Sequence, residues 1–203
     1  YDITYTTVGL CPQDSTITMN IAETPAVNAI ADQTVCPLTG DEFNTVFISG
    51  SVGSTFNWVN DNVSIGLAAS GTGDIAGFLG VNNTAAAISA TVTVTPIAGT
   101  CTGVSTDFTY IVNPLDDPGF SYPAYEFCTA DLVDPAATID VAGGGFTSTT
   151  IIGTGSLSID AGTGQIDLDA SDAGTYEITY TTTDLCPQDS TITMVINLTP
   201  VVN

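Results

Sequence analysis

An internal repeat restricts the fold of this chain more than any other feature of its sequence. Residues 1–28 read YDITYTTVGLCPQDSTITMNIAETPAVN, and residues 176–203 read YEITYTTTDLCPQDSTITMVINLTPVVN. Twenty-one of these 28 positions are identical at a sequence offset of 175 (176 − 1). The chain therefore holds one complete period, 1–175, and the start of another copy, 176–203. Such similar copies indicate tandem duplication, so we expect this chain to be a piece of a longer array.

Prolines divide the period into two modules. Pro25 and its equivalent Pro200 each follow an alternating strand pattern, and Pro114 lies between them. Proline cannot donate to a sheet ladder, so each one is expected to end a strand. Each full module has about the size of an immunoglobulin-like sandwich. The predicted domains are a partial domain over 1–25, a sandwich over 26–114, and a sandwich with the start of the next linker over 115–203.

The hydrophobic pattern has the period of a β-strand. Apolar side chains alternate with Ser and Thr along residues 88–95, 176–181 and 191–196, as in strands that bury one face. Glycine-rich segments at 142–145 and 161–164 are typical of the turns between such strands. No segment shows the period of an amphipathic helix. The sequence therefore predicts an all-β fold of tandem immunoglobulin-like sandwiches in an extended array.

Two aromatic residues favour the immunoglobulin type of sandwich. The segment Asp172-Ala-Gly-Thr-Tyr176 resembles a tyrosine corner, in which the tyrosine hydroxyl bonds to the backbone a few residues upstream. Antibody domains have a cysteine two residues later, where this chain has Ile178. Trp58 is the only tryptophan and lies among alternating residues. We expect Trp58 to be a core residue rather than a platform that stacks on a ligand.

Five cysteines become an orderly set once the repeat is applied. Cys11 and Cys186 occupy the same position in successive copies. Pairing within each predicted domain gives the disulfides Cys36–Cys101 and Cys128–Cys186, and leaves Cys11 for a cysteine of an upstream repeat. A metal site is the other interpretation, but the chain has no histidine and no Cys-x-x-Cys spacing. Disulfides place a protein outside the reducing cytosol.

The composition excludes whole classes of function. The chain has no Lys, Arg or His and has 22 acidic residues, so its formal net charge is −22. Without cations it cannot neutralise phosphates, which excludes nucleic acids and binding to anionic lipid through a basic patch. General bases and activated nucleophiles are reduced to carboxylates, so we predict that the chain is not an enzyme. No apolar run is long enough for membrane insertion, whereas a hydrophobic content of 43% can support a packed core.

Several segments resemble a known family of repeats. Residues 56–75, 90–96 and 101–103 look like the PKD-like repeats of Bacteroidota surface proteins. The second module is similar to the Ig-like repeats that accompany them, through residues 120–122, 127–128, 174–176 and 186–187. Such PKD-like and Ig-like repeats fill the giant adhesins of the SprB type, which are exported by type IX secretion and act in gliding motility. The resemblance covers essentially the whole chain, implies an extracellular, cell-surface location, and transfers no functional residues.

Two kinds of binding or modification site can be read from the polar residues. Asp116 and Asp117 lie after Pro114, and Asp61 lies in a second oxygen-rich cluster. Hard oxygen ligands suit Ca²⁺, but acids in turns also bond their own backbone, and that role is favoured, so no cofactor is required. Ser15 and Ser190 follow an aspartate and precede a threonine, a pattern that resembles Bacteroidota O-glycan acceptors. The simpler interpretation is that these positions only open a strand.

Together these observations predict a structural stalk segment of a very large extracellular adhesin or surface filament. Its partners would be the neighbouring repeats of the same chain, with surface polysaccharide or other cell-surface components as further candidates. One alternative is a carbohydrate-binding module, for which Tyr122 and Tyr125 are the aromatic residues to test. Another alternative is a self-assembling filament subunit, which needs exposed edge strands or complementary faces.

Overall fold

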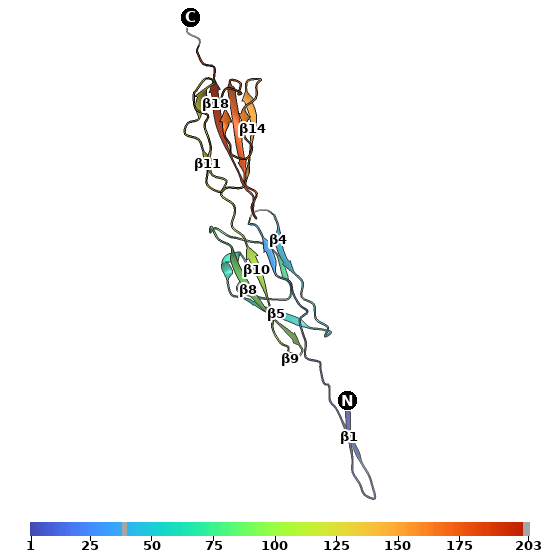
Figure 1. The fold of residues 1–203 in the computed structure, drawn as a ribbon. Coiled ribbons are helices and arrows are strands. Elements are labelled where there is room, and N and C mark those ends of the chain that lie inside the picture. Colours follow the sequence, from blue (N-terminus) through green and yellow to red (C-terminus); the bar gives the residue numbers. More distant parts are fainter. Residues whose placement is uncertain (38–39, 201–203) are drawn as a thin grey trace. The chain divides into compact units, whose positions relative to one another are not determined.

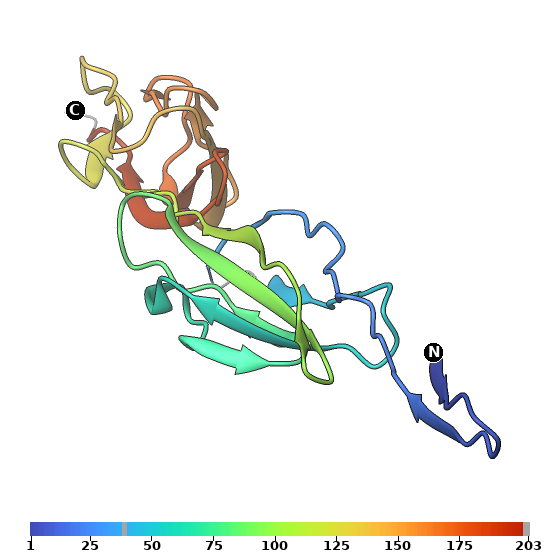
Figure 2. The same ribbon diagram turned by 90° about the horizontal axis from the view of Figure 1, so that it is seen from below.

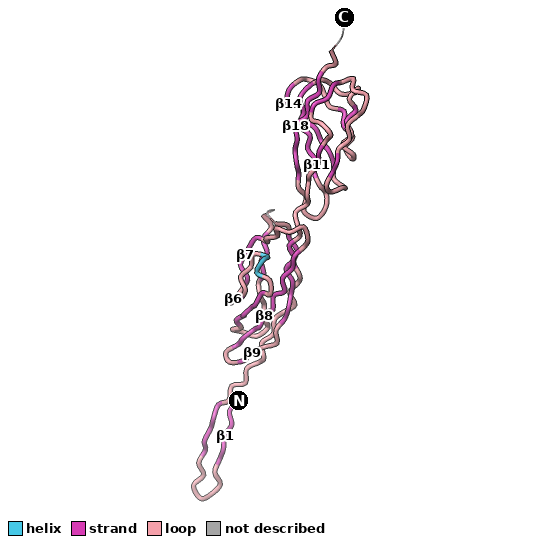
Figure 3. Tube along the Cα trace, turned by 90° about the vertical axis from the view of Figure 1, so that its left-hand side faces the viewer, coloured by secondary structure: helices cyan, strands magenta, loops and turns pink. Residues whose placement is uncertain are grey.

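The computed structural model describes residues 1–37 and 40–200, and these form two compact units. The first unit comprises residues 1–35, 40–81 and 89–111, and the second comprises 36–39, 82–88 and 112–203. Nearly every regular element is a strand, and the fold is all-β as the alternating pattern predicted (Figure 1). Among the described residues the exception is η1 (Val63–Ile65), a short 3-10 helix that Figure 3 marks in cyan. The last three residues of the predicted domain 115–203 lie outside the described residues.

The first unit is built around a six-stranded sheet with the order β3-β10-β8-β5-β6, in which β9 pairs with β8. The long strands β8 and β10 lie side by side in Figure 2. Strands β4 and β7 form a separate antiparallel pair, and β1 and β2 form a hairpin. The strands are β1 (Asp2–Thr6), β2 (Asp14–Thr18), β3 (Gln33–Val35), β4 (Glu42–Thr45), β5 (Thr55–Asn60), β6 (Ser70–Thr72), β7 (Ile75–Leu79), β8 (Ile88–Ala98), β9 (Cys101–Thr102) and β10 (Thr106–Val112).

Alternation along β5, β8 and β10 produces the core of this unit. The predicted inward positions of residues 88–95 are Ile88, Ala90, Val92 and Val94. Ala90, Val92 and Val94 of β8 are buried and Ile88 is half-buried, which confirms the alternation. Trp58 of β5 is 7% exposed, so its prediction as a core residue is also confirmed. Its indole packs on the backbone of Gly71 in the neighbouring β6, where a Cβ would clash with the ring. Glycine is therefore required at this point of the sheet.

The second unit has a four-stranded sheet with the order β12-β18-β17-β14. Two antiparallel pairs, β11–β13 and β15–β16, accompany it. The pairing of β12 with β18 is parallel, whereas β17 pairs antiparallel with both of its neighbours. The strands are β11 (Phe120–Ser121), β12 (Glu126–Cys128), β13 (Thr138–Ile139), β14 (Gly145–Ile152), β15 (Ser158–Ile159), β16 (Ile166–Asp167), β17 (Gly174–Thr181) and β18 (Asp189–Asn197).

The core of the second unit follows the same alternation. Tyr176, Ile178 and Tyr180 of β17 are fully buried, and Met194 and Ile196 of β18 lie beside them. These are the inward positions that the period-two pattern predicted. The Tyr176 hydroxyl donates to the Asp172 carbonyl oxygen at 2.7 Å, which confirms the tyrosine corner. Aromatic rings from Phe120 and Phe146 close the core around Tyr180, among the other buried residues.

Candidate functional site

The repeated segment folds into the same hairpin in both copies. In the first copy Ile3 pairs with Ile17, and in the second Ile178 pairs with Ile192, and every pair in β1–β2 recurs at the repeat offset. The loop closes alike in both copies: the Thr7 amide donates to the Gln13 carbonyl at 2.8 Å, and the Thr182 amide donates to the Gln188 carbonyl at 2.9 Å. The register and the loop closure of the hairpin are therefore the same in both copies.

The two copies differ in what covers them. In β17 the Ile178 and Tyr180 side chains are fully buried, whereas their equivalents Ile3 and Tyr5 in β1 are 49% and 70% exposed. Met194 is buried and its equivalent Met19 is 46% exposed. The first hairpin thus presents, uncovered, an apolar face that the second hairpin uses as a sandwich core.

The cover of the second hairpin comes from the rest of its unit. Strand β14 pairs along β17, and β12 pairs along β18. The Tyr180 hydroxyl donates to the Val141 carbonyl at 2.6 Å and accepts from the Gly144 amide at 2.9 Å. All of these partners precede the hairpin in the sequence. A copy of the hairpin needs such a preceding segment to bury its apolar face.

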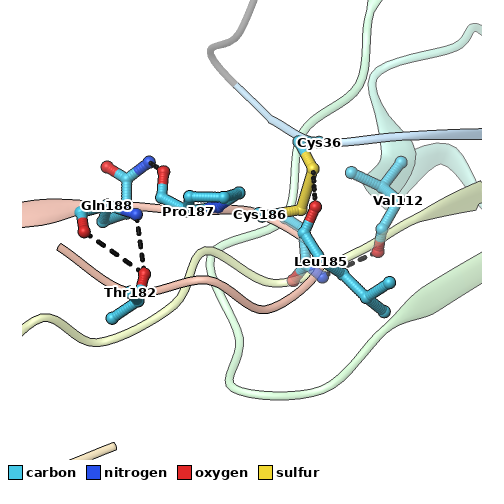
Figure 4. The surroundings of a disulfide bond; sticks show 8 residues. Cys36, Val112, Thr182, Leu185, Cys186, Pro187 and Gln188 are labelled. Carbon is cyan, nitrogen blue, oxygen red and sulfur yellow. Dashed lines mark hydrogen bonds between the residues drawn. A yellow bond between two sulfur atoms is a disulfide. The ribbon is translucent and has the colours of Figure 1, made fainter. Parts of the chain in front are cut away.

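The cysteine of the second hairpin is disulfide-bonded, but not to the partner that the sequence predicted. Cys186 pairs with Cys36, 150 residues upstream, with a Cα–Cα distance of 5.5 Å (Figure 4). Both residues belong to the second unit. The predicted pairs Cys36–Cys101 and Cys128–Cys186 are therefore wrong, and Cys11, Cys101 and Cys128 are free thiols. On the chain-entropy model, closing a loop of this length stabilises the fold by about 5 kcal/mol.

Strand direction explains why Cys36 does not pair with Cys101. Ala26 forms a parallel bridge with Val104, and the Thr109 amide donates to the Asp32 carboxylate at 2.7 Å. The two segments therefore run in the same direction. Cys36 follows the first segment and Cys101 precedes the second, so these cysteines lie at opposite ends of the sheet.

The parallel pairing of β12 with β18 separates the other predicted pair. Cys128 lies opposite Asn197, at the end of β18, whereas Cys186 precedes the start of that strand at Asp189. Eight steps along a strand (197 − 189) span about 27 Å. A disulfide needs Cα atoms within about 7 Å of each other, so this bond cannot form within the unit.

Of the residues proposed for calcium, Asp61 belongs to the first unit, whereas Asp116 and Asp117 are adjacent in sequence and belong to the second. The Asp61 carboxylate accepts from the Thr91 amide at 2.7 Å, and the Asp117 carboxylate accepts from the Gly119 amide at 3.0 Å. One carboxylate oxygen of Asp116 is buried without a hydrogen-bond partner. Among residues 1–37 and 40–200, no group of three or more His, Cys, Asp or Glu is placed to hold a metal ion. Calcium binding stays a prediction without a supporting site.

The two serines proposed for glycosylation occupy equivalent ladder positions. Ser15 lies opposite Tyr5 in the first hairpin and is exposed, and Ser190 lies opposite Tyr180 and is half-buried. Both lie inside strands rather than in loops. Glycosylation of these serines is untested, and of the two the Ser15 side chain is the more accessible.

Acidic residues of the second unit gather at one shallow depression, lined by Asp134, Asp160 and Asp167 among others. Each carboxylate accepts from a backbone amide nearby, from Leu168 at 3.0 Å, Thr163 at 2.7 Å and Ala170 at 3.0 Å respectively. Hydrogen bonds from the Thr163 amide and hydroxyl and the Gly162 amide lower the pKa of Asp160. These carboxylates thus accept backbone hydrogen bonds that shape turns, in line with the turn role favoured by the sequence.

The two tyrosines named for carbohydrate binding have different environments. Tyr122 is 5% exposed and its hydroxyl donates to the Gly164 carbonyl oxygen, so it belongs to the core. Tyr125 is 48% exposed. Sugar-binding faces stack rings on exposed aromatic side chains, so Tyr122 is corrected from a candidate platform to a core residue.

Comparison with solved structures identifies the fold. The chain is similar to the N-terminal eight immunoglobulin domains of Down Syndrome Cell Adhesion Molecule isoform 1.30.30, with a TM-score of 0.50 and 13% identity, over 92% of this chain and 26% of that one. Mouse cadherin-23 EC22-24 gives a TM-score of 0.46 and 15% identity, over 88% of this chain and 67% of that one. Together with the sheets described above, the first likeness shows an all-β, immunoglobulin-like fold, and at this identity it shows the fold alone.

Sequence comparisons add no family. No family model matches this chain, and no curated protein matches it. Among its described residues there is no helix long and apolar enough to cross a membrane.

Proposed function

We propose that this chain is a stalk segment of a very large extracellular adhesin or surface filament, built from tandem sandwich modules. The modules would be of the PKD-like and Ig-like kind found in Bacteroidota adhesins exported by type IX secretion. In that setting the stalk would carry an adhesive tip for surface attachment or gliding. Its partners would be neighbouring repeats of the same chain.

The uncovered first hairpin is the observation that carries this proposal. Its ladder matches that of β17–β18, and its exposed side chains are equivalent to core residues of the second unit. Exposed apolar faces of this kind need a covering partner in a soluble protein. A preceding copy of the second unit would supply that cover through equivalents of β12 and β14. The hairpin is then the last part of one module and the start of the linker to the next.

Three further properties support an extracellular stalk. The chain carries a disulfide, which is a bond of oxidising compartments. The aspartates that gather at the depression, Asp134, Asp160 and Asp167, accept backbone hydrogen bonds in turns. Its net charge of −22 without any cation favours repulsion between neighbouring molecules over non-specific association.

The length of the molecule in solution tests the proposal. One additional period, appended after Asn203 as a copy of residues 29–203, adds two modules. Each module should contribute about 35–40 Å, from strands of this length and a short linker. Small-angle X-ray scattering should therefore show the maximum dimension growing by about 70–80 Å. A lengthened chain that folds but becomes rounder instead of longer would contradict the stalk.

A further inference from the structure

We propose that Cys128 of each repeat forms a disulfide with the equivalent of Cys101 in the next repeat, across the linker that joins them. The inference rests on the tandem array proposed above. It concerns two thiols that are free in this chain, and it follows from where the strand registers place each of them along the linker.

The end of the second unit fixes the position of Cys128. Cys128 is the ladder partner of Asn197, the last residue of β18. The contact continues beyond the strand, because the Thr129 amide donates to the Asn197 carbonyl at 2.9 Å and the Ala130 amide donates to the Thr199 hydroxyl at 3.1 Å. Cys128 therefore lies against the linker at residue 197.

The start of the first unit fixes the position of Cys101 in the same way. Ala26 and Val104 form a parallel bridge, and the Gly103 backbone lies so close to the Pro25 carbonyl oxygen that it leaves no room for a Cβ. Counting back by three positions on both segments brings Cys101 level with Glu23. The repeat offset of 175 makes Glu23 the equivalent of residue 198.

The two positions meet when the repeat is applied. Cys128 of one repeat lies beside residue 197, and the Cys101 equivalent of the next repeat lies level with residue 198 of the same linker. Each cysteine lies one strand spacing, about 4.8 Å, from the linker, and their positions along it differ by about 3.3 Å. A disulfide joins Cα atoms about 4.4–6.8 Å apart, so the bond requires both segments to approach the linker from the same side. Both thiols are half-buried rather than enclosed, so each can be reached by the other and by an oxidant.

This pairing accounts for all five cysteines with one rule. Cys36 pairs with Cys186 inside the period. Cys11 is the equivalent of Cys186, so its partner is the Cys36 equivalent of an upstream copy. Cys101 takes its partner from the upstream repeat and Cys128 from the downstream repeat. Each free thiol of this chain thus lacks a partner because that partner belongs to another copy.

The bond forms by ordinary thiol–disulfide exchange. The two thiols lose two protons and two electrons and become one disulfide, and the disulfide of an oxidant is reduced to two thiols. Oxidised glutathione supplies this oxidant in solution, and an oxidised dithiol protein would supply it in an extracytoplasmic compartment.

Counting thiols by mass in the chain lengthened by one period tests the inference. The original chain, refolded with oxidised glutathione and alkylated under denaturing conditions, should carry three alkyl groups, on Cys11, Cys101 and Cys128. The lengthened chain has nine cysteines, five plus the four of residues 29–203. It should again carry three alkyl groups, because three disulfides form. Five alkyl groups on a folded, lengthened chain would overturn the inference and leave the stalk proposal intact.

A matched variant identifies the pair. Replacing only the first Cys128 with Ser should raise the count from three to four, because the Cys101 equivalent of the second copy loses its partner. Replacing the first Cys101 should lower the count from three to two, since that thiol is free in both chains. If instead the first Cys101 proves to be oxidised, the cross-link lies within one period and the inference is wrong. The maximum dimension measured by scattering on the same samples tests the stalk proposal separately. A lengthened chain that is compact would contradict the stalk even if it shows three free thiols.

Discussion

Three buried tyrosines of the second unit satisfy their hydroxyls by bonding to backbone carbonyls. Tyr176 donates to Asp172 and Tyr180 donates to Val141, while the Tyr122 hydroxyl bonds to Gly164. Unpaired, a buried hydroxyl would cost about 1–3 kcal/mol. Burial raises the pKa values of Tyr110, Tyr122 and Tyr176, and the nearby Asp172 carboxylate adds to the effect at Tyr176.

These raised pKa values predict a loss of stability in alkali. Unfolded tyrosine ionises near pH 10, whereas the folded protein holds Tyr110, Tyr122 and Tyr176 neutral above that pH. Stability is therefore fully present below pH 10 and is lost as the pH rises through the folded pKa values. Urea unfolding should show a lower midpoint at pH 11 than at pH 8. With no lysine in the chain, no ammonium side chain ionises in this range.

A tyrosine variant provides the control for this titration. Tyr176→Phe should lower the unfolding free energy at pH 8 by about 1 kcal/mol, through the lost hydrogen bond. It should also shrink the difference between pH 8 and pH 11, because one buried group no longer ionises. An unchanged midpoint between the two pH values in the original chain would contradict the assignment.

Local sequence patterns were sufficient to predict the environments of Tyr176 and Trp58. The Asp-Ala-Gly-Thr-Tyr segment indicated the corner at Tyr176, and alternation indicated the burial of Trp58. Tyr122 was different, because the pattern around residues 120–125 does not show which of its two tyrosines faces inward. Tyr122 is the one that faces inward, where its hydroxyl donates a hydrogen bond to the carbonyl oxygen of Gly164, 42 positions away in the sequence.

At the scale of elements, the two hairpins form an internal comparison. They share sequence and register, and they differ in cover. Side-chain burial can therefore be varied while the local sequence is held nearly constant. If equivalent substitutions in the two hairpins change the unfolding free energy by different amounts, the difference comes from the surrounding sheet and not from the hairpin itself.

Equivalent truncations in the two hairpins should have unequal effects. Ile178→Ala removes a fully buried side chain and should lower the unfolding free energy by about 2–5 kcal/mol, through lost burial and a cavity. Ile3→Ala removes a side chain that is half-exposed and should change it by less than about 0.5 kcal/mol. Chemical unfolding of both variants makes the comparison. Equal losses would show that the first hairpin is covered in solution.

The positions of the strands could be predicted from the sequence, but the pairing of distant cysteines could not. The alternating segments at 88–95, 176–181 and 191–196 are strands in the structure. The predicted cysteine pairing failed because it assigned Cys36 to the module 26–114, whereas Cys36 belongs to the second unit together with Cys186. Whether two cysteines meet depends on which ends of parallel strands lie together, as with Cys128 beside Asn197. Such long-range pairing leaves no mark on the local pattern.

At the scale of the whole molecule, the absence of cations is the dominant property. Between the two copies of the repeated segment, seven of 28 positions differ and none is Lys, Arg or His. An accident of composition would be expected to erode as the copies diverge. Selection for an acidic surface that repels neighbouring molecules accounts better for the continued absence of cations in both copies.

Trypsin, which cuts after Lys and Arg, tests this interpretation on the parent protein. The reduced and unfolded chain should stay intact, while a protease that cuts after aromatic residues should degrade it. If the array is depleted of cations throughout, trypsin digestion of the unfolded parent should release this segment within a fragment much longer than the segment itself. Fragments of about one period would show that other repeats contain Lys or Arg, and would favour an accident of composition over selection.

The parallel pairing of early and late segments has a mechanical consequence. Strand β12 pairs in parallel with the end of β18 in the second unit, and in the first unit Ala26 forms a parallel bridge with Val104. In a parallel pair of this kind, tension drawn through the two ends of the chain acts along the strands. The bonds between them are then loaded together in shear and must break together, rather than opening one at a time as in an unzipping hairpin. We therefore expect these pairs to resist tension along the chain more strongly than a hairpin that unzips.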